Sequence, residues 1–417
     1  VFAYSQEEGS LAAKMEGQVD EEVKLERAQE ALDLAESLGF AATAAHVGER
    51  AQVIVDGIEE TEDGAAGDTH PDPGDHRIPE GLGRIAGLVH DDGAREDVLE
   101  LISRHLTEFG EQFPAETCVQ GYYPLTENVE WTTSFWTGQL WLAWEMSGES
   151  KFREMAEKHV RSFGLRIAGR HDTNTHDLGF LYTLSCVAAW RLTGNRDARG
   201  FSLMAAEALL ERFHEKAQII QAWGDLRDPD QAGRMIIDCN MNLPLLYWAS
   251  EQTGDPRFAN AAKAHVAQAA KYLIRQDAST FHTYYMDVQT GAPRYGNTQQ
   301  GYADDSCWSR GQAWGIYGFL LSYIYTGDTQ MVQLSKKLAN YFLNRLPEDA
   351  VCHWDLALVG TDALRDSSSA AIAVCGLLEL IKHLPVTDPD RECYQQWAMG
   401  IMSSLTRHYL MGKDEQG

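Results

Sequence analysis

The sequence predicts an all-α protein built from repeated helix pairs, and three observations support this prediction. Nearly apolar helical stretches alternate with amphipathic ones along most of the chain. A short glycine-containing turn separates the two members of each pair. Long strands are missing from the series. Because apolar helices belong inside a fold and amphipathic ones outside it, the pairs indicate a solenoid or a closed ring of helical hairpins.

The first 92 residues lack this pattern, and we predict that they form an acidic extension. Residues 1–90 carry 6 basic and 20 acidic side chains, about half of the net charge of −27. Residues 20–38 fit an amphipathic helix. Residues 59–76 combine acidic and turn-forming residues, which is typical of a linker or a disordered segment. We therefore divide the chain into a partly disordered extension, 1–92, and a helical domain, 93–417.

From residue 93 onward the helix pairs follow one another, beginning with an outer helix over 95–109. Nearly apolar inner helices are predicted over 135–146, 179–192, 242–252, 315–325 and 370–381. Glycine turns end the first four of these at 147–150, 193–196, 253–256 and 326–329. Glycine caps a helix C-terminus, and the Ser, Asn or Asp beside it begins the next helix. Six outer and five inner helices result, so a closed barrel of six pairs would lack its last inner helix at the C-terminus.

One insertion interrupts the series between Ala278 and Ser306. Its residues alternate in polarity as in a strand, turn at Thr290–Pro293 and return. This pattern predicts a β-hairpin over one end of the ring.

Composition excludes several classes of function. A net charge of −27 disfavours nucleic acid, whose binding depends on neutralising phosphates. Apolar runs are too short for a membrane span, and the N-terminal residues do not resemble a secretory signal. Seven cysteines without a CxxC motif indicate reduced, buried thiols in a cytoplasmic protein. Ligand spacings typical of a metal site are missing, and no cofactor is expected.

Polar and aromatic side chains gather just before the inner helices. Every inner helix of a ring of hairpins begins at the same end, so these side chains should meet at one rim. They are Trp131, His176, Asp177, Trp223, Arg234, Asp238, His282, Gln300, Trp308, Arg310, Gln312, Arg365 and Asp366, with Trp314 one turn into its helix. Aromatic faces together with polar groups beside apolar helices are typical of a saccharide site.

Several of these side chains also have a structural interpretation. Asp177 and Asp238 could cap helices, or they could form an acid–base pair whose titrations are split by burial and mutual repulsion. Arg310 could hold a substrate carboxylate or pair with Asp304 or Asp305. The tryptophans could belong to the core, and His282 could be a satisfied structural histidine.

The segments that carry these residues resemble the unsaturated glucuronyl hydrolases, glycoside hydrolase family 88. The matching stretches are WTTSFWTGQLWLAWE, HDLGFLYTLS, IIQAWGD, MIIDCNMNLPLLYWASEQTGDP, FHTYYMD, QQGYADDSCWSRGQAWGIYGF and RDSSSAAIAVCGLLEL, within about residues 93–412. The resemblance implies an (α/α)6 barrel. It implies an enzyme that removes a 4,5-unsaturated uronic acid from the non-reducing end of oligosaccharides made by polysaccharide lyases.

The resemblance also implies roles for individual residues. Asp238 would be the general acid and base that hydrates the ring double bond, and Asp177 would stay ionised beside it. The residues expected to bind the unsaturated sugar and its carboxylate are Trp131, His176, Trp223, His282, Gln300, Trp308, Arg310 and Trp314. The expected partner is an unsaturated oligosaccharide, and the protein would be a monomer or a weak homo-oligomer.

Three alternatives remain at this point. The unsaturated rhamnogalacturonyl hydrolases of family 105 share the barrel and the hydration chemistry, but act on pectin-derived substrates. A non-catalytic helical-ring protein that binds carbohydrate would need the aromatic residues and not the paired acids. An ordinary glycosidase would cleave saturated glucuronides. The extension 1–92 has no counterpart in the family, and the family's chain continues past residue 417.

Overall fold

The computed structural model describes residues 92–119, 121–228 and 231–409. Contacts divide the chain into two units, 1–77 with 84–95, and 78–83 with 96–417. The helix predicted over 20–38 and the linker predicted over 59–76 lie outside the described residues. Residues 92–95 belong to the first unit, and all other described residues belong to the second.

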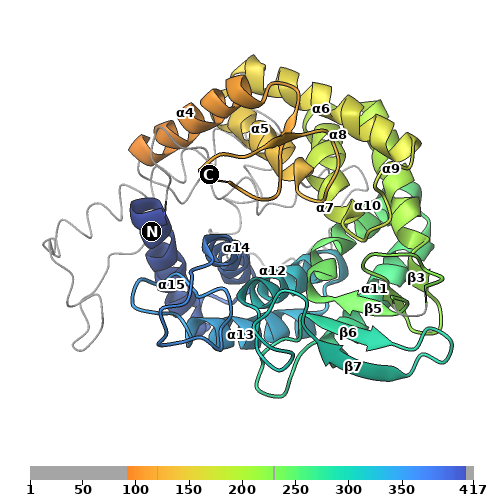
Figure 1. Cartoon of the computed structure of the whole chain (residues 1–417), viewed down its shortest axis with the longest axis vertical. Helices are drawn as coiled ribbons and strands as arrows, with labels where there is room; N and C mark the ends of the chain where they lie inside the picture. The colour runs from red at the N-terminus through yellow and green to blue at the C-terminus, as the bar shows by residue number, and fades with distance from the viewer. Residues whose placement is uncertain (1–91, 120, 229–230, 410–417) are drawn as a thin grey trace, which may run out of the picture. The chain divides into compact units, whose positions relative to one another are not determined.

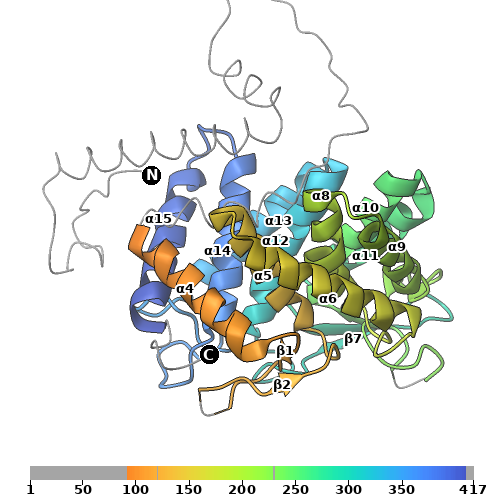
Figure 2. The ribbon, with the colours of Figure 1, turned by 90° about the horizontal axis from the view of Figure 1, so that it is seen from above.

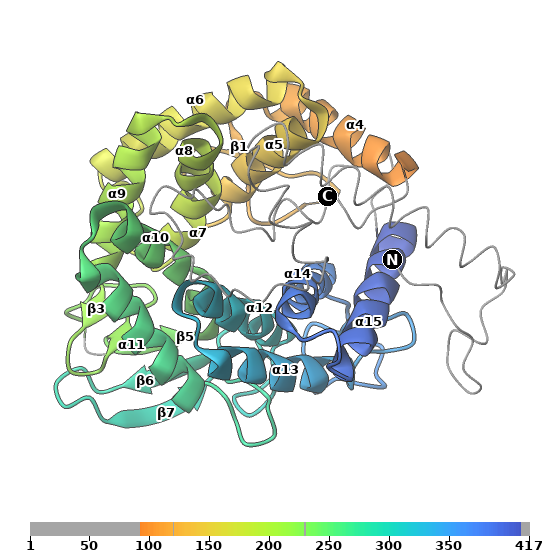
Figure 3. The same cartoon turned by 180° about the vertical axis from the view of Figure 1, so that it is seen from behind.

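The helices of the second unit form two layers around a ring (Figure 1). Within the described residues the inner layer consists of α5 (Thr133–Ser147), α7 (Leu178–Tyr182) with α8 (Ala188–Thr193), α10 (Leu243–Thr253), α12 (Ser309–Thr326) and α14 (Ser367–His383). The outer layer consists of α4 (Asp92–Phe109), α6 (Ser150–Ala168), α9 (Arg196–Leu210), α11 (Pro256–Tyr272), α13 (Thr329–Leu343) and α15 (Asp390–Ser404). Seen from behind, α13 and α15 lie outside α12 and α14 (Figure 3). The inner and outer helices predicted within residues 93–417 are confirmed in the described part of the chain, except that the one predicted over 179–192 is not continuous.

Burial follows the two layers. Inner helix α12 is apolar on all sides and buries most of its residues. Outer helix α11 buries one stripe, Phe258, Ala261, Ala262, His265, Val266 and Ala269, at helical spacing. The core therefore lies between the layers, where the outer stripes meet the inner helices. Among the helices that the structure describes, none combines the length and apolar character that a bilayer crossing requires.

The helix predicted over 179–192 is interrupted by a wider π turn at Thr183–Val187. The indole Nε1 of Trp141 donates to the carbonyl of Ser185 at 3.2 Å. The Ser185 hydroxyl donates to the carbonyl of Leu181. Hydrogen bonds from side chains to backbone carbonyls of a helix are a recognised cause of irregular helix turns.

The four glycine turns behave as the sequence predicts at the glycine itself, the second residue of each turn. Gly148, Gly194, Gly254 and Gly327 have φ between 69° and 73° and end their helices in the left-handed conformation. The next residue caps the following helix in three turns, through the side chains of Asn195, Asp255 and Asp328. In the first turn Glu149 occupies this position without a capping hydrogen bond.

Short strands lie at one end of the ring, where Figure 2 shows β1, β2 and β7. The pairs are β1 (Phe113–Pro114) with β2 (Leu125–Thr126), and β3 (Phe213–His214) with β4 (Ile219–Ile220). The predicted hairpin is confirmed as β6 (Thr283–Met286) and β7 (Pro293–Asn297). The sequence did not indicate its third strand, β5 (Arg234–Ile236), which pairs Ile236 with Thr283.

The seven cysteines are all free thiols, as expected, but their burial is uneven. Cys186, Cys239, Cys307 and Cys352 are buried, whereas Cys393 is exposed. The expectation of buried thiols is therefore wrong for Cys393 and holds only in part for Cys118 and Cys375, which are partly buried. It lies on outer helix α15, whose buried face carries Tyr394, Ala398 and Ile401 instead.

Candidate active site

Two aspartates and a histidine meet at the end of the ring where the inner helices begin. His176 and Asp177 directly precede α7. Asp238 lies in a 3-10 turn, Ile237–Met241, that leads into α10. Nε2 of His176 is 3.4 Å from Oδ1 of Asp177 and 3.6 Å from Oδ1 of Asp238. Residues about sixty positions apart in the sequence are thus gathered around one imidazole.

Close packing of two backbones makes this meeting possible. A Cβ atom on Gly179 would lie 2.2 Å from Cα of Asn242, so only glycine fits at this position. The Asn242 side chain then joins the two segments. Its Oδ1 accepts the backbone N–H of Phe180 at 2.7 Å, and its Nδ2 donates to the carbonyl of Asp238 at 3.4 Å.

Neither aspartate acts as a helix cap. The Asp177 carboxylate makes no capping bond and instead accepts the Thr175 hydroxyl at 2.7 Å. Oδ1 of Asp238 is buried and has no hydrogen-bond partner. A buried polar atom without a partner costs folding free energy, so its retention points to a role outside folding. The capping interpretation is wrong for both residues.

The environment of Asp238 favours a protonated carboxyl group. Burial raises the pKa of Asp238 to about 6, the neighbouring Asp177 carboxylate adds to the rise, and His176 and Arg310 oppose it. Although Oδ1 is buried, the side chain keeps 19% of its area exposed. A carboxyl group that titrates near neutrality and can be reached from outside is able to donate a proton and take one back.

His176 is the least satisfied polar side chain at the centre of this group. Its side chain is 1% exposed, and neither ring nitrogen has a hydrogen-bond partner. The imidazole and the two carboxylates offer one ligand atom each, all within 4.8 Å of one another, and this is close enough to hold a metal ion. The absence of a metal site, expected from ligand spacing in the sequence, therefore stays a prediction.

Aromatic rings form a wall beside the acids. Trp308, Trp314 and Phe180 form a buried cluster against which Trp131 and Phe135 pack. The ring of Trp314 is 5.1 Å from that of Phe180, and the Trp131 ring is 5.8 Å from the same phenylalanine. Trp308 and Trp314 are each 5% exposed, so both serve as core and as part of the wall.

Arg310 lies over the face of Trp308, with Cζ 5.1 Å from the ring centroid. Its Nη1 donates to the Ser368 hydroxyl at 3.1 Å, and its Nε is 3.8 Å from Oδ2 of Asp366. The expected alternative, an ion pair with Asp304 or Asp305, is wrong, because the N-cap and the first turn of α14 supply the partners. A cleft beside this guanidinium is lined by Arg310, Trp354, Leu364, Arg365, Asp366, Ser367 and Ser368.

His282 is held as a neutral imidazole. Its Nδ1 accepts the backbone N–H groups of Gln299 at 3.0 Å and Gln300 at 3.2 Å, so the ring proton lies on Nε2. Burial and, to a smaller extent, the nearby Arg310 guanidinium together lower the pKa of His282 to about 3. The ring is 4.4 Å from that of Trp308, which places it beside the aromatic wall. Gln300 itself is exposed.

Trp223 is attached to the same rim by its backbone and its ring. It pairs with Thr175, two residues before Asp177, in an isolated β-bridge. The guanidinium of Arg234 lies 4.7 Å from the Trp223 ring centroid and donates from Nε to the Tyr285 hydroxyl at 2.9 Å. Eight of the ten predicted site residues lie just before or within the first turns of inner helical segments or directly before β6, whereas Trp223 lies on the loop before β5 and Gln300 on the loop between β7 and α12.

The sequence did not single out Asp355, a fully buried carboxylate that organises the loop before α12. Oδ2 accepts the backbone N–H of Tyr302 and the Ser306 hydroxyl, and Oδ1 accepts the N–H of Cys307 and of Ala357. This loop leads directly into Trp308 and Arg310. Asp355 precedes no helix, so the pattern that identified the rim residues could not find it.

Comparisons with known proteins give a consistent result. The sequence profile of the family described as Glycosyl Hydrolase Family 88 matches residues 102–346. The unsaturated chondroitin disaccharide hydrolase of Streptococcus pneumoniae is 46% identical over 317 residues, which cover 76% of this chain and 80% of that protein. The profile match spans the chain from within α4 to just past α13 and includes both acids.

Solved structures agree with the sequence relatives. The unsaturated glucuronyl hydrolase of Bacillus sp. GL1, described as responsible for the degradation of glycosaminoglycan, matches with a TM-score of 0.76 and 42% identity, over 78% of this chain and 87% of that one. A variant of the Streptococcus agalactiae enzyme, complexed with dGlcA-GalNAc6S, matches with a TM-score of 0.68 and 41% identity, over 77% and 80% of the two chains.

Proposed function

Because the chain belongs to glycoside hydrolase family 88 and is an unsaturated glucuronyl hydrolase, we propose that it removes 4,5-unsaturated glucuronic acid from glycosaminoglycan-derived oligosaccharides. The residue removed is the one at the non-reducing end, where a polysaccharide lyase leaves the double bond. One observation carries the proposal: Asp238 has a partly accessible carboxyl group whose pKa is raised to about 6, beside a second carboxylate.

Asp238 performs the chemistry in this proposal by hydrating the double bond. Its carboxyl group donates the proton to carbon 4 of the sugar, and the resulting carboxylate takes a proton from the water that adds to carbon 5. The product is a hemiketal, which opens and expels the rest of the oligosaccharide. Asp177 stays ionised, and its charge helps to keep Asp238 protonated before the reaction. The distance rule for ordinary glycosidases does not apply, because the anomeric carbon is not attacked.

The rim residues bind the sugar in the same proposal. Arg310 lies over Trp308, its side chain is 30% exposed and it lines the cleft, so its guanidinium can offer N–H groups to the uronate carboxylate. Aromatic faces suit the apolar faces of a sugar ring, and polar groups suit its hydroxyls. The binding set is Trp131, His176, Trp223, His282, Gln300, Trp308, Arg310 and Trp314.

The alternatives fit less well. A carbohydrate-binding protein gains nothing from two close carboxylates, one of them with a buried and unpartnered oxygen. The profile that matches is that of family 88, which disfavours the rhamnogalacturonyl hydrolases of family 105. An ordinary glycosidase would act on saturated glucuronides, and we expect this enzyme to ignore them.

The proposal extends to architecture and setting. We propose an (α/α)6-barrel architecture, which the inner and outer layers of the described helices and the match to solved relatives support. The partner is an unsaturated uronate-containing oligosaccharide, not nucleic acid or a membrane. The protein acts as a monomer or weak homo-oligomer in the cytoplasm, and its free thiols are compatible with this location.

The test follows the ultraviolet absorbance of the unsaturated uronate during incubation with an unsaturated chondroitin disaccharide. Wild type should bleach it, and Asp238→Asn should reduce the rate about a thousandfold, within the range of a general acid–base group. Asp255→Asn is the matched control, since Asp255 caps outer helix α11 and Asn caps equally well. An active Asp238→Asn enzyme, or faster turnover of an unsaturated rhamnogalacturonan disaccharide, would contradict the proposal.

A further inference from the structure

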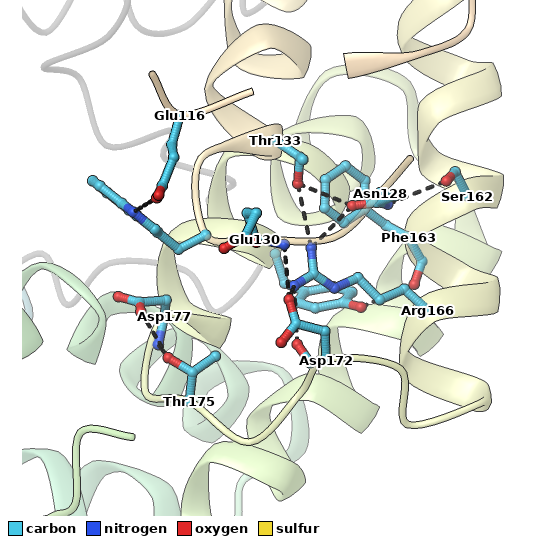
Figure 4. A network of polar contacts seen from close by, with 12 residues as sticks. Glu116, Asn128, Glu130, Thr133, Ser162, Phe163, Arg166, Asp172, Thr175 and Asp177 are labelled. Atoms are coloured by element: carbon cyan, nitrogen blue, oxygen red, sulfur yellow. Dashed lines mark hydrogen bonds and ion pairs between the residues drawn. The ribbon is translucent and has the colours of Figure 1, made fainter. Parts of the chain in front are cut away.

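A buried arginine on an outer helix ties together the two segments that lead into α5 and α7. Arg166 belongs to α6, and its side chain is 1% exposed. Nη1 donates to Oδ1 of Asn128 at 3.0 Å and to the Thr133 hydroxyl at 3.3 Å, on the segment that enters α5. Nη2 donates to the carbonyl and to Oδ2 of Asp172, each at 2.9 Å, on the loop that enters α7 (Figure 4).

The Asp172 carboxylate also bonds to the segment that enters α5. Its Oδ2 also accepts the backbone N–H of Glu130 at 2.7 Å. Glu130 has a φ of 64° and Asp172 a φ of 47°, so both lie in the left-handed region. Non-glycine residues adopt this conformation at a cost in conformational free energy, and they stay in it when surrounding contacts hold them there. Here one guanidinium and one carboxylate fix both.

Trp131 lies between the two fixed points of the first segment. Glu130 precedes it and is held by Asp172, and Thr133 follows it and is held by Arg166. The Trp131 indole Nε1 donates to Oε2 of Glu116 at 3.0 Å, and its ring packs against Phe180. Figure 4 shows this chain of contacts, with Glu116, Glu130, Arg166 and Asp172 labelled. The backbone on either side of Trp131 is thus set by the Arg166–Asp172 pair.

We propose that Arg166 and Asp172 are positioning residues that hold the Trp131 ring in place for the unsaturated sugar. The proposal rests on the proposed function, in which Trp131 contacts the substrate. It assigns to the pair an effect on substrate binding through Trp131, with no direct contact between the pair and the reacting atoms.

A purely structural role would give a different result. The Asp172 side chain is 50% exposed, whereas Arg166 is 1% exposed, so loss of the carboxylate has a cost in folding stability. Arg166 keeps its bonds to Asn128, Thr133 and the Asp172 carbonyl, and these should hold the fold while Glu130 is freed from its left-handed conformation. A neighbouring pair in the same loop provides the control. Arg170 also has a positive φ, of 53°, and both of its Nη atoms bind the Glu211 carboxylate at 2.7 Å, with both side chains more than half exposed.

The experiment compares Asp172→Ala with Arg170→Met in steady-state hydrolysis of the unsaturated disaccharide. Asp172→Ala should raise KM about tenfold and leave kcat within about twofold, because contact with a sugar face contributes mainly uniform binding. Arg170→Met should change neither constant. In a Trp131→Ala background the Asp172→Ala substitution should lose its effect on KM, since the side chain that it positions is gone. Arg166→Lys should fall between wild type and Arg166→Met in KM.

Three outcomes would overturn the inference. They are an unchanged KM in Asp172→Ala, an equal rise in KM in Arg170→Met, and a rise of the same size in the Trp131→Ala background. If wild type hydrolyses the unsaturated disaccharide, any of these three outcomes would overturn the inference alone and leave the proposed function standing. An inactive wild type would remove the proposed function, and this inference with it.

Discussion

Acidic and amide side chains stand at helix starts at both ends of the ring, and the two ends use them differently. Before the outer helices, Asn195, Asp255 and Asp328 each accept a backbone N–H of the helix that they precede. Before the inner helical segments, Asp177 makes no such bond, and Asp238 keeps one oxygen buried without a partner. At this end Asp366 still caps inner helix α14 by accepting the backbone N–H of Ser369. The two acids beside His176 depart from that capping role, which is the one that acids and amides fill before the outer helices.

Glycines divide between the two ends in the same way. Gly254 ends inner helix α10 at the end of the ring where the outer helices begin. Its φ is 73°, and a Cβ placed on it would meet open space. Gly179 stands at the rim, where a Cβ would overlap Asn242. One glycine is needed for its backbone conformation and the other for its missing side chain. The glycine turns therefore specify the fold, whereas the close packing at the rim brings together catalytic side chains from segments far apart in the sequence.

Substitution of the two glycines gives the largest expected contrast. Gly179→Ala should lower kcat/KM about a hundredfold, because pushing α7 away from Asn242 separates Asp177 from Asp238, and small displacements of catalytic groups are costly. Gly254→Ala should leave kcat/KM unchanged and lower the free energy of unfolding by about 1 kcal/mol. Initial rates and urea unfolding measure the two effects.

An Asn242→Ala variant provides the matched control for the rim glycine. It removes the amide that joins Phe180 to Asp238 without adding an atom, so it separates the loss of these hydrogen bonds from the displacement of the backbone. Its loss of activity should be smaller than that of Gly179→Ala. Equal losses of activity in Gly179→Ala and Gly254→Ala would contradict the division between rim and turn.

The fold could be predicted from the sequence because its signals are local. Apolar and amphipathic helices alternate, and a glycine in each turn fixes where one helix ends, so the helix pairs can be read from neighbouring residues. The interruption at Thr183–Val187 could not be foreseen, since it depends on Trp141 reaching the Ser185 carbonyl from another helix. Strand β5 was missed because three residues carry too little periodicity to be recognised.

Only those site residues that lie at or near the start of an inner helix could be predicted from the sequence. Asp177, Asp238 and Arg310 were found because they precede or begin inner helices. Their partners were not, because Asp366 reaches Arg310 from a later loop and Asn242 reaches Phe180 across two segments. Asp355 was missed for the same reason. Contacts between distant segments depend on packing that no local pattern records.

A smaller effect is expected in how folding stability depends on pH, where Asp238 should differ from the acids that cap the outer helices. Its folded pKa is about 6, above the usual value of about 4 for an unfolded chain, so protonated Asp238 stabilises the fold at low pH. This stability is lost as pH rises through about 6, and the difference between the two pKa values corresponds to about 3 kcal/mol. Asp238→Asn should therefore be more stable than wild type at pH 8 by up to that amount.

The measurement is the difference in unfolding free energy between Asp238→Asn and wild type, at pH 5 and at pH 8. Other titrating groups are common to both proteins and cancel in the difference. The variant's advantage should grow between the two pH values. A constant difference would mean that Asp238 is not held protonated by its surroundings, and the assignment of the general acid would lose its support.

The smallest expected effect comes from the opposite end of the ring. Asn195 accepts the backbone N–H groups of Asp197 at 3.1 Å and Ala198 at 3.0 Å at the start of α9. Asn195→Ala should lower the free energy of unfolding by about 1 kcal/mol, the usual value of an N-cap. It should leave kcat, KM and the pH dependence of stability unchanged, because α9 lies outside the rim. A parallel loss of activity would show that the turns also shape the site, and the contrast between the two ends would fail.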